Sequence, residues 1–186
     1  IHLSLRAMIY QRSGDIKGAI KDYDSCLDLG GENQIFSHRR GLLHVRVGQW
    51  NQALKDLEPL PKKGKSAAFF NSLGVAKLRV GRLKDALKDF DRAIKGAQDA
   101  TYHLNRAFVL DKLGRKNEAR QACDICLKLD DKNSNGWLLR AFLNKALEDY
   151  RGMREDLEQY LIFQPNSSRS QEFREDLKGV LMAAGC

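Results

Sequence analysis

Apolar residues recur along this chain at steps of three and four positions, in segments that glycine interrupts. This spacing predicts amphipathic helices, because residues three and four positions apart share one helical face. One segment carries Phe69, Phe70, Leu73, Gly74 and Leu78, and the next carries Leu83, Ala86, Leu87, Phe90, Ala93 and Ile94. Gly81 lies between them and readily adopts the left-handed backbone conformation that ends a helix. The pattern therefore predicts a helix, a tight turn and a second helix.

The same arrangement repeats at a nearly constant interval. A small residue is followed seven positions later by glycine and twelve positions later by alanine. The small residues are Ala7, Gly41, Gly74, Ala107 and Ala141, at successive intervals of 34, 33, 33 and 34 residues; the first four are followed by Gly14, Gly48, Gly81 and Gly114 and by Ala19, Ala53, Ala86 and Ala119. Such a period is typical of stacked repeats. Small residues let two helices approach closely, so we expect each repeat to be an antiparallel helical hairpin.

This spacing resembles the tetratricopeptide repeat (TPR). The matching residues are Ala7, Tyr10, Gly14, Ala19, Tyr23 and Cys26 in the first repeat, Gly74, Lys77, Gly81, Ala86, Phe90 and Ala93 in the third, and Ala107, Leu110, Gly114, Ala119, Cys123 and Cys126 in the fourth. The resemblance implies an all-α fold, a right-handed TPR superhelix (an α-α solenoid). We expect five repeats within residues 1–165, at about 1–33, 34–66, 67–99, 100–133 and 134–166, and a C-terminal capping helix at 167–186. The chain opens inside the first expected helix without a Met, so we expect a fragment of a longer protein.

The second repeat departs from the pattern at two prolines. Pro59 and Pro61 fall where its second helix would continue. Proline inside a helix removes a hydrogen bond and clashes with the preceding turn. We therefore expect this helix to stop near Glu58 and to give way to a loop from Leu60 to Ser66.

The fifth repeat departs differently, with Glu148 and Met153 where glycine and alanine are expected. Terminal repeats are often atypical because one of their faces meets a cap. The following stretch, residues 166–168, offers helix N-caps. Beyond it, Phe173, Leu177, Val180, Leu181 and Ala184 share one helical face. We expect this segment to cover the last hairpin.

Charged residues follow the same period. An arginine precedes the small residue at Arg6, Arg40, Arg106 and Arg140, and an aspartate stands sixteen residues beyond that place at Asp22, Asp56, Asp89 and Asp156. Three repeats hold both partners. We favour ion pairs between the two helices of a hairpin over a row of arginines aimed at a ligand, because the carboxylates recur with the arginines.

In the TPR family the first helices of the repeats line a concave groove that holds extended peptides or partner helices. The resemblance implies a groove lined by Met8, Arg12, His38, Arg39, Leu42, Arg46, Asn71, Val75, Arg79, Asn105, Phe108, Lys112, Leu138 and Phe142. One column of this set, Arg12, Arg46, Arg79 and Lys112, stands two residues before each glycine. Two interpretations stay open, and both can hold. The helix macrodipole favours cations in the last turn of a helix, or these residues form a basic stripe that faces a ligand.

The charge is unevenly distributed. The chain has a net charge of +8, with 42% hydrophobic and 30% charged residues, which is ordinary for a globular protein. Between Pro61 and Lys95, ten Lys or Arg residues stand against three Asp, so this segment carries +7 and the remainder +1. The basic patch comprises Lys62, Lys63, Lys65, Lys77, Arg82, Lys84 and Lys88. Such a patch attracts acidic partners; a solvated surface without a partner is the alternative.

Catalytic and metal-binding patterns find little support. Cys123 and Cys126 form Cys-x-x-Cys, but they fall on helix-packing positions, as Cys26 does, so we expect them in the core. His38 and His44 frame no zinc-binding pattern. We predict no enzymatic activity, no cofactor and no metal. The cysteine usage favours a cytoplasmic, reducing compartment, and no apolar run is long enough for membrane insertion.

We therefore expect a protein-protein interaction scaffold or adaptor that binds a peptide or helical segment, with acidic character, in the groove. A structural subunit of a large assembly, for example a ciliary one, is the alternative. Chaperone-tail binding is a minor alternative, since Asn105 matches the carboxylate clamp of that TPR subclass but Asn71 and Val75 do not. RNA binding is another, and nucleic acid is disfavoured because the nearby aromatics Phe69 and Phe70 stand at packing positions.

Overall fold

The protein is all-α over the residues that the structure describes. This computed structural model describes residues 2–30 and 33–183, with side chains at these positions except Asp176 and those from Lys178 onward. The chain divides into two compact units, Ile1–Gly96 and Ala97–Cys186. We call them the N-terminal unit and the C-terminal unit and describe each by itself.

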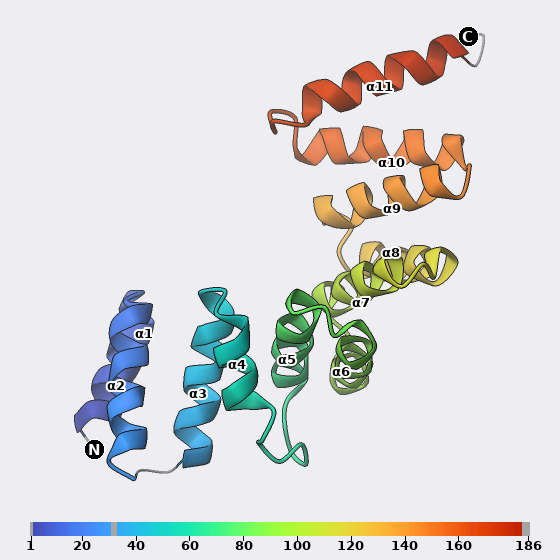
Figure 1. Cartoon of the computed structure of the whole chain (residues 1–186). Helices are drawn as coiled ribbons and strands as arrows, with labels where there is room; N and C mark the ends of the chain where they lie inside the picture. Colours follow the sequence, from blue (N-terminus) through green and yellow to red (C-terminus); the bar gives the residue numbers. More distant parts are fainter. Residues whose placement is uncertain (1, 31–32, 184–186) are drawn as a thin grey trace. The chain divides into compact units, whose positions relative to one another are not determined.

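The N-terminal unit consists of three helical hairpins. Its helices are α1 (His2–Ser13), α2 (Ile16–Asp28), α3 (Asn33–Arg46), α4 (Trp50–Leu57), α5 (Ala67–Arg79) and α6 (Leu83–Gly96). Within the hairpins α1 packs on α2, α3 on α4 and α5 on α6, and successive hairpins join through α2 with α3 and α4 with α5 (Figure 1). The first helices of the repeats are α1, α3 and α5, and α3 contacts α5 directly.

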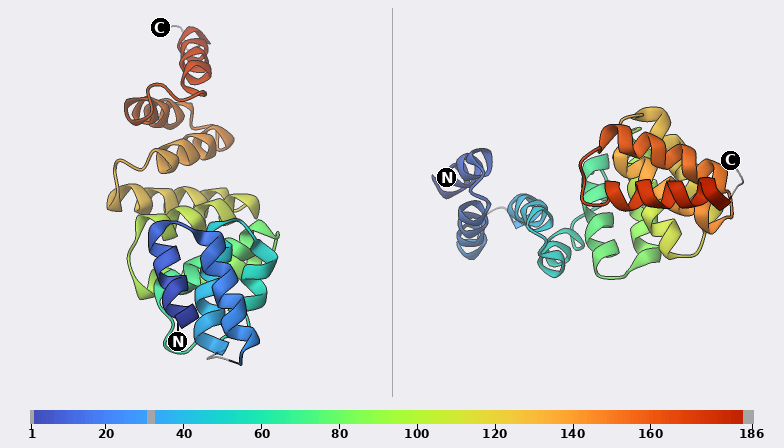
Figure 2. Two further views of the ribbon diagram at one scale, coloured as in Figure 1. Left: turned by 90° about the vertical axis from the view of Figure 1, so that its left-hand side faces the viewer. Right: turned by 90° about the horizontal axis from the view of Figure 1, so that it is seen from above.

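The C-terminal unit consists of two hairpins and one further helix. Its helices are α7 (Ala100–Lys112), α8 (Lys116–Leu129), α9 (Ser134–Ala146), α10 (Tyr150–Phe163) and α11 (Ser170–Ala183). The hairpins α7/α8 and α9/α10 pack through α8 and α9, and α11 lies beside α10 (Figure 2). The helices follow the hydrophobic pattern in order, and the repeat boundaries given above stay a prediction.

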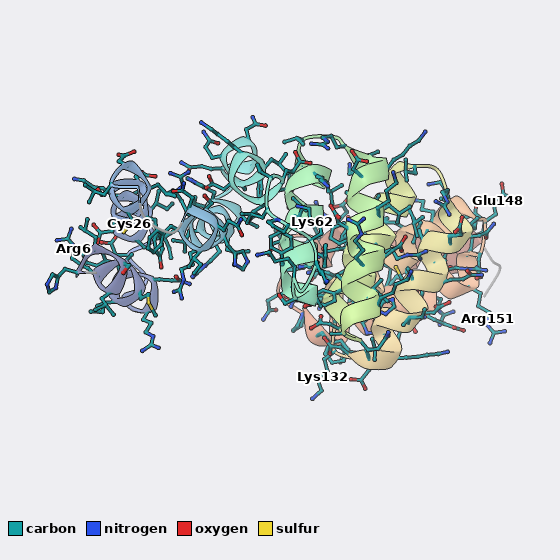
Figure 3. The ribbon with its side chains drawn as sticks, turned by 90° about the horizontal axis from the view of Figure 1, so that it is seen from below. Arg6, Cys26, Lys62, Lys132, Glu148 and Arg151 are labelled. Carbon is teal, nitrogen blue, oxygen red and sulfur yellow. The ribbon has the colours of Figure 1, made fainter. Side chains whose placement is uncertain are left out.

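Each hairpin turn has one residue in the left-handed backbone region. The values of φ are 88° at Gly14, 77° at Gly48, 81° at Gly81 and 76° at Gly114. In the last hairpin Glu148 takes this place with a φ of 61° (Figure 3). Its N–H donates to the carbonyl of Lys145 at 3.1 Å, as a glycine would in this turn. The left-handed conformation costs a residue with a side chain about 1–2 kcal/mol, so the fifth repeat keeps the turn at the expense of stability.

Two hairpins close at positions that leave no room for a side chain. A Cβ atom added to Gly74 would lie 2.8 Å from Cε1 of Phe90. One added to Gly41 would lie 2.6 Å from Cδ2 of Leu57. Both separations are shorter than carbon atoms tolerate in contact. Phe90 and Leu57 are fully buried, so the small residues are requirements of the packing.

The second hairpin is cut short as the two prolines predict. Helix α4 ends at Leu57, with Glu58 as its C-cap. The loop that follows is tied to the core, because Leu60 is buried and packs in one cluster with Leu57, Phe69 and Leu73. The prediction that this helix stops near Glu58 is confirmed.

The last helix of the C-terminal unit packs on the preceding hairpin. Phe173 of α11 is buried against Tyr160 of α10, with ring centroids 5.6 Å apart, and Leu177 packs against the same cluster. The hydroxyl of Tyr160 lies 3.1 Å from that of Ser167 in the connecting turn. Of the other residues expected on this face, Val180, Leu181 and Ala184 have side chains outside the described residues.

Candidate protein-binding surface

One row of arginines joins the helices inside the hairpins. The pairs are Arg6 with Asp22 (2.7 and 2.8 Å), Arg40 with Asp56 (2.6 and 2.8 Å), and Arg140 with Asp156 (2.6 Å at the shortest). All three aspartates are buried. The hydrogen bond from Arg6 holds the pKa of Asp22 below its usual value. The expected ion pairs within hairpins are confirmed in these repeats, so these arginines belong to the interior bonding of the fold.

Two of these arginines also reach an aspartate of the preceding repeat. Arg40 Nη1 donates to Asp24, and Arg140 Nη1 donates to Asp124, each at 2.7 Å. We did not predict these bonds from the sequence, although both aspartates stand sixteen residues before their arginine, which mirrors the first interval. Each arginine thus links successive hairpins as well as the helices of one hairpin.

The third repeat keeps the aspartate, Asp89, and makes the equivalent bond with a different cation. Leu73 stands in the arginine's place, and Lys77, one turn further along α5, donates to Asp89 at 2.5 Å. Asp89 is 1% exposed and Lys77 is 8% exposed. A charge buried this deeply requires a partner. Lys77 therefore lies in the interior, and we remove it from the basic patch.

A second row of cations lies at the ends of the first helices. Arg12, Arg46 and Arg79 are exposed in the last turns of α1, α3 and α5, and Lys112 is exposed in the last turn of α7. Among the described residues none of these four side chains forms an ion pair or donates a hydrogen bond. The guanidinium of Arg79 lies over the ring of Trp50, 5.5 Å from its centre. These charges are available to an acidic partner.

The remaining predicted groove residues of the N-terminal unit are Met8, His38, Arg39, Leu42, Asn71 and Val75, all partly exposed. His38 meets Phe69 edge-on, with ring centroids 5.3 Å apart. Burial, followed by the charges of Lys65 and Arg39, lowers the pKa of His38. The imidazole is therefore neutral at pH 7. Its Nε2 atom is buried and lacks a hydrogen-bond partner within the described part of the chain.

The predicted groove residues of the C-terminal unit are mostly apolar. Phe108 on α7 and Phe142 on α9 are 37% and 45% exposed, and these two helices are in contact. Leu138 and Asn105 are partly buried on the same helices. Phe142 also meets Phe173 of α11, with ring centroids 6.0 Å apart. This surface thus offers aromatic carbon, with Lys112 as its one cation among the five predicted groove residues.

Lys62, assigned above to the basic patch, closes the end of α4. Its Nζ atom donates to the carbonyl oxygens of Leu57 at 3.0 Å and Glu58 at 2.9 Å. The same nitrogen lies 5.2 Å from the ring centre of Phe69, and Lys65 lies 5.5 Å from it. Burial lowers the pKa of Lys62. These two lysines fix the loop between α4 and α5.

Some of the other residues of the basic patch are paired with acidic side chains, and others are not. Arg82 forms ion pairs with Glu58 at 2.9 Å and Asp85 at 3.0 Å. Lys88 lies 3.9 Å from Asp85. Lys63 and Lys84 are exposed and have no hydrogen-bond or ion-pair partner within the described residues. The net charge of this segment therefore overstates the free charge that it presents.

The three cysteines among the described residues lie in the core. Cys26 is 7% exposed, and Cys123 and Cys126 are fully buried. Burial raises the pKa of Cys126 to about 11 and also raises the pKa of Cys123. Both therefore remain thiols at pH 7, whereas a reactive cysteine is a thiolate.

Within the described ranges, no group of three or more His, Cys, Asp or Glu side chains is placed to hold a metal ion. No helix in these ranges combines the length and hydrophobicity needed to span a bilayer.

Family models of the tetratricopeptide repeat match most of the chain. One model matches residues 38–97 and 71–134, and a second matches residues 3–29. A search of curated protein sequences gives no match.

Similar solved structures show the same fold. YrrB, described as a TPR protein with an unusual peptide-binding site, aligns with a TM-score of 0.78 at 18% identity, over 94% of this chain and 91% of its own. The first TPR of Spaghetti (RPAP3), bound to the HSP90 peptide SRMEEVD, aligns with a TM-score of 0.59 at 17% identity, over 63% of this chain and 94% of its own. A chain of the APC/C hetero-tetramer Cut9-Hcn1 gives 0.76 at 18% identity, over 92% of this chain and 35% of that chain.

Proposed function

Because the chain belongs to the tetratricopeptide repeat family, we propose that it is a non-enzymatic scaffold for protein–protein interaction. It binds a peptide or helical segment along the first helices of its repeats, in the groove that the family resemblance implies. The bound segment carries acidic side chains. The buried thiols suit a reducing, cytoplasmic compartment, in which an adaptor of this kind would act.

The contrast between two rows of cations on the same helices carries this proposal. On α3, Arg40 is bonded to two aspartates, whereas Arg46, six residues further on, is exposed and has no such partner among the described residues. A cation that served only the helix end could bond terminal carbonyls directly, as Lys62 does at the end of α4. Arg46 makes no such side-chain bond within the described part of the chain. Exposed guanidinium groups are suited to bidentate binding of carboxylates.

Two of the similar structures support a peptide as the ligand. YrrB is described by its peptide-binding site, and the first TPR of Spaghetti was solved with a peptide bound. The exposed Phe108 and Phe142 of the C-terminal unit add apolar surface that a peptide side chain would cover.

The test uses short peptides selected on the wild-type protein from a random display library, then labelled with fluorescein and measured by fluorescence anisotropy. Arg46→Glu combined with Arg79→Glu is expected to abolish binding, because both positions then repel an acidic peptide. The urea midpoint of unfolding is expected to stay within experimental error, since both side chains are exposed.

Lys21→Glu combined with Lys55→Glu is the matched control. Both lysines are exposed on the second helices α2 and α4, and their reversal changes the net charge by the same amount. Affinity that is unchanged in the arginine variant, or lost equally in the lysine variant, rejects the first helices as the binding surface. Cross-linking mass spectrometry after a pull-down from cell extract then identifies the natural partner and the surface it touches.

A second candidate is a structural subunit of a large multiprotein assembly. Exposed apolar side chains on the second helices favour it: Ile125 and Leu129 of α8 are 40% and 46% exposed, and Ile162 of α10 is 65% exposed. This candidate predicts that these residues are covered by a stable partner. A monodisperse monomer by light scattering, with no stable partner in a cell extract, counts against it.

A further inference from the structure

A small hollow opens between α1, α2 and α3 of the N-terminal unit. It has a volume of about 100 Å³ and is lined by Ser4, Met8, Tyr23, Ile35, Phe36 and Arg39. Five of these residues come from the first helices α1 and α3, and Met8 and Arg39 are predicted groove residues. About three water molecules occupy this volume in liquid water, so the hollow is large enough for the end of one side chain.

Tyr23 forms the floor of this hollow. It is the one lining residue from a second helix, and it is fully buried. Its ring lies 6.0 Å from that of Phe36 between centroids. Its hydroxyl is buried and finds no hydrogen-bond partner among the described residues. Buried hydroxyl groups are normally bonded, and one left without a partner needs an explanation.

Arg39 supplies the charge of the hollow. It is partly exposed, and its guanidinium forms no ion pair or hydrogen bond within the described part of the chain. The side walls are apolar, formed by Met8, Ile35 and Phe36. A phenol that can donate, a free guanidinium and apolar walls together match a side chain with an apolar stem and a carboxylate at its end.

We propose that this hollow is an anchor subsite for a glutamate or aspartate side chain of the bound segment. The carboxylate accepts one hydrogen bond from the Tyr23 hydroxyl and one from the Arg39 guanidinium, and its stem lies against Met8 and Phe36. This inference rests on the proposed function and adds the place where one acidic side chain is bound. Tyr23 is fully buried, so side chains around the hollow must move aside when the ligand enters, and the flexible Met8 and Arg39 are the lining side chains suited to do so.

The experiment removes only the hydroxyl, with Tyr23→Phe. The probe is a peptide from the display selection above, acetylated and amidated at its ends, so that every carboxylate belongs to a side chain. Binding is expected to weaken about ten-fold, the value of one hydrogen bond to a charged group. The urea midpoint is expected to stay equal or to rise, because an unsatisfied buried group is removed.

A double-mutant cycle identifies the anchor residue of the peptide. Each acidic residue of the probe is replaced in turn by alanine, and one replacement is expected to weaken binding to the wild type while adding little to Tyr23→Phe. Tyr10→Phe is the control, since Tyr10 lies on α1 outside the lining of the hollow.

The outcomes separate this inference from the proposed function. Peptides whose affinity depends on Arg46 and Arg79 but is unchanged by Tyr23→Phe overturn the anchor subsite alone. Peptides whose affinity is unaffected by Arg46, Arg79 and Tyr23 alike overturn both. Equal losses with Tyr23→Phe and Tyr10→Phe, without coupling to any acidic residue of the probe, also contradict the subsite.

Discussion

The first-helix faces of the two units have different chemistry over the same kind of interior. In the N-terminal unit the predicted groove positions include the exposed Arg12, Arg46 and Arg79. In the C-terminal unit they include the exposed Phe108 and Phe142. Beneath both faces, a buried aspartate in the second helix bonds a cation or amide from the first, as Asp56, Asp89 and Asp156 do.

Charged residues thus occur in two places in a repeat: in the interior, between the helices, and on the exposed face of the first helix. The interior cations hold helices together, and each is bonded to one or two carboxylates. The face charges have no such match within the described residues, and they vary between the units.

The largest expected effect tests whether the buried aspartates stabilise the two units equally. Asp89→Ala in the N-terminal unit and Asp156→Ala in the C-terminal unit should each cost about 3 kcal/mol of unfolding free energy, because each leaves a cation without its buried partner. Urea denaturation followed by circular dichroism measures the loss. Asp89→Asn combined with Lys77→Met is the control and should recover much of the stability, since the buried charges are removed together. A loss below about 1 kcal/mol in the single variants would show that these bonds matter little.

The next effect tests the difference between the faces. Phe108→Ala combined with Phe142→Ala should weaken peptide binding about ten-fold through lost apolar contact, without changing how affinity depends on salt. Neutralising the two arginines, with Arg46→Gln combined with Arg79→Gln, should instead weaken binding and also make the affinity less dependent on salt. Anisotropy titrations over a series of NaCl concentrations distinguish the two. A flatter salt dependence in the phenylalanine variant would contradict this division.

A smaller effect compares the turns of the two units. Glu148→Gly should stabilise the C-terminal unit by about 1 kcal/mol, because glycine adopts the positive φ without steric cost. Gly81→Ala should destabilise the N-terminal unit by a similar amount, and this loss comes from backbone conformation, since an added Cβ would meet no atom within 4 Å. Thermal unfolding measures both. Equal stability of Glu148→Gly and the wild type would mean that other contacts of Glu148 offset the strain.

The smallest effect is expected at a face cation. Arg79→Gln should change the unfolding free energy by less than about 0.5 kcal/mol, as is usual for exposed positions. The change is expected near the upper end of this range, because Arg79→Gln removes the contact between the guanidinium and the Trp50 ring. A loss comparable with that of Asp89→Ala, in the same urea titration, would place Arg79 among the structural cations.

Much of the fold was predictable because its causes are local. Pro59 and Pro61 ended α4 at Leu57, since proline inside a helix removes a backbone hydrogen bond and clashes with the preceding turn. The sixteen-residue interval predicted the pairing of Arg6 with Asp22, because a constant hairpin geometry brings those positions together. The start of α11 was predicted less accurately. The helix begins at Ser170, beyond residues 166–168, which the sequence offered as its N-caps.

Other features depended on contacts between helices and could not be predicted from the pattern. Lys62 and Lys77 were counted as exposed charge, yet one closes the end of α4 and the other neutralises Asp89. Tyr23 was assigned only a place in the repeat pattern, and nothing in its spacing indicated a hydroxyl without a partner. The direction that a long side chain takes depends on which neighbours leave room for it.

The sequence by itself determined the helices, their turns, the repeat and the ion pairs that recur with it, because the steric properties of glycine and proline and the helical period act over a few residues. The tertiary structure decided which cations are neutralised and which remain free on the first-helix faces. That outcome depends on separations of a few ångströms between side chains of different helices, and on how deeply each is buried, which the order of residues does not express.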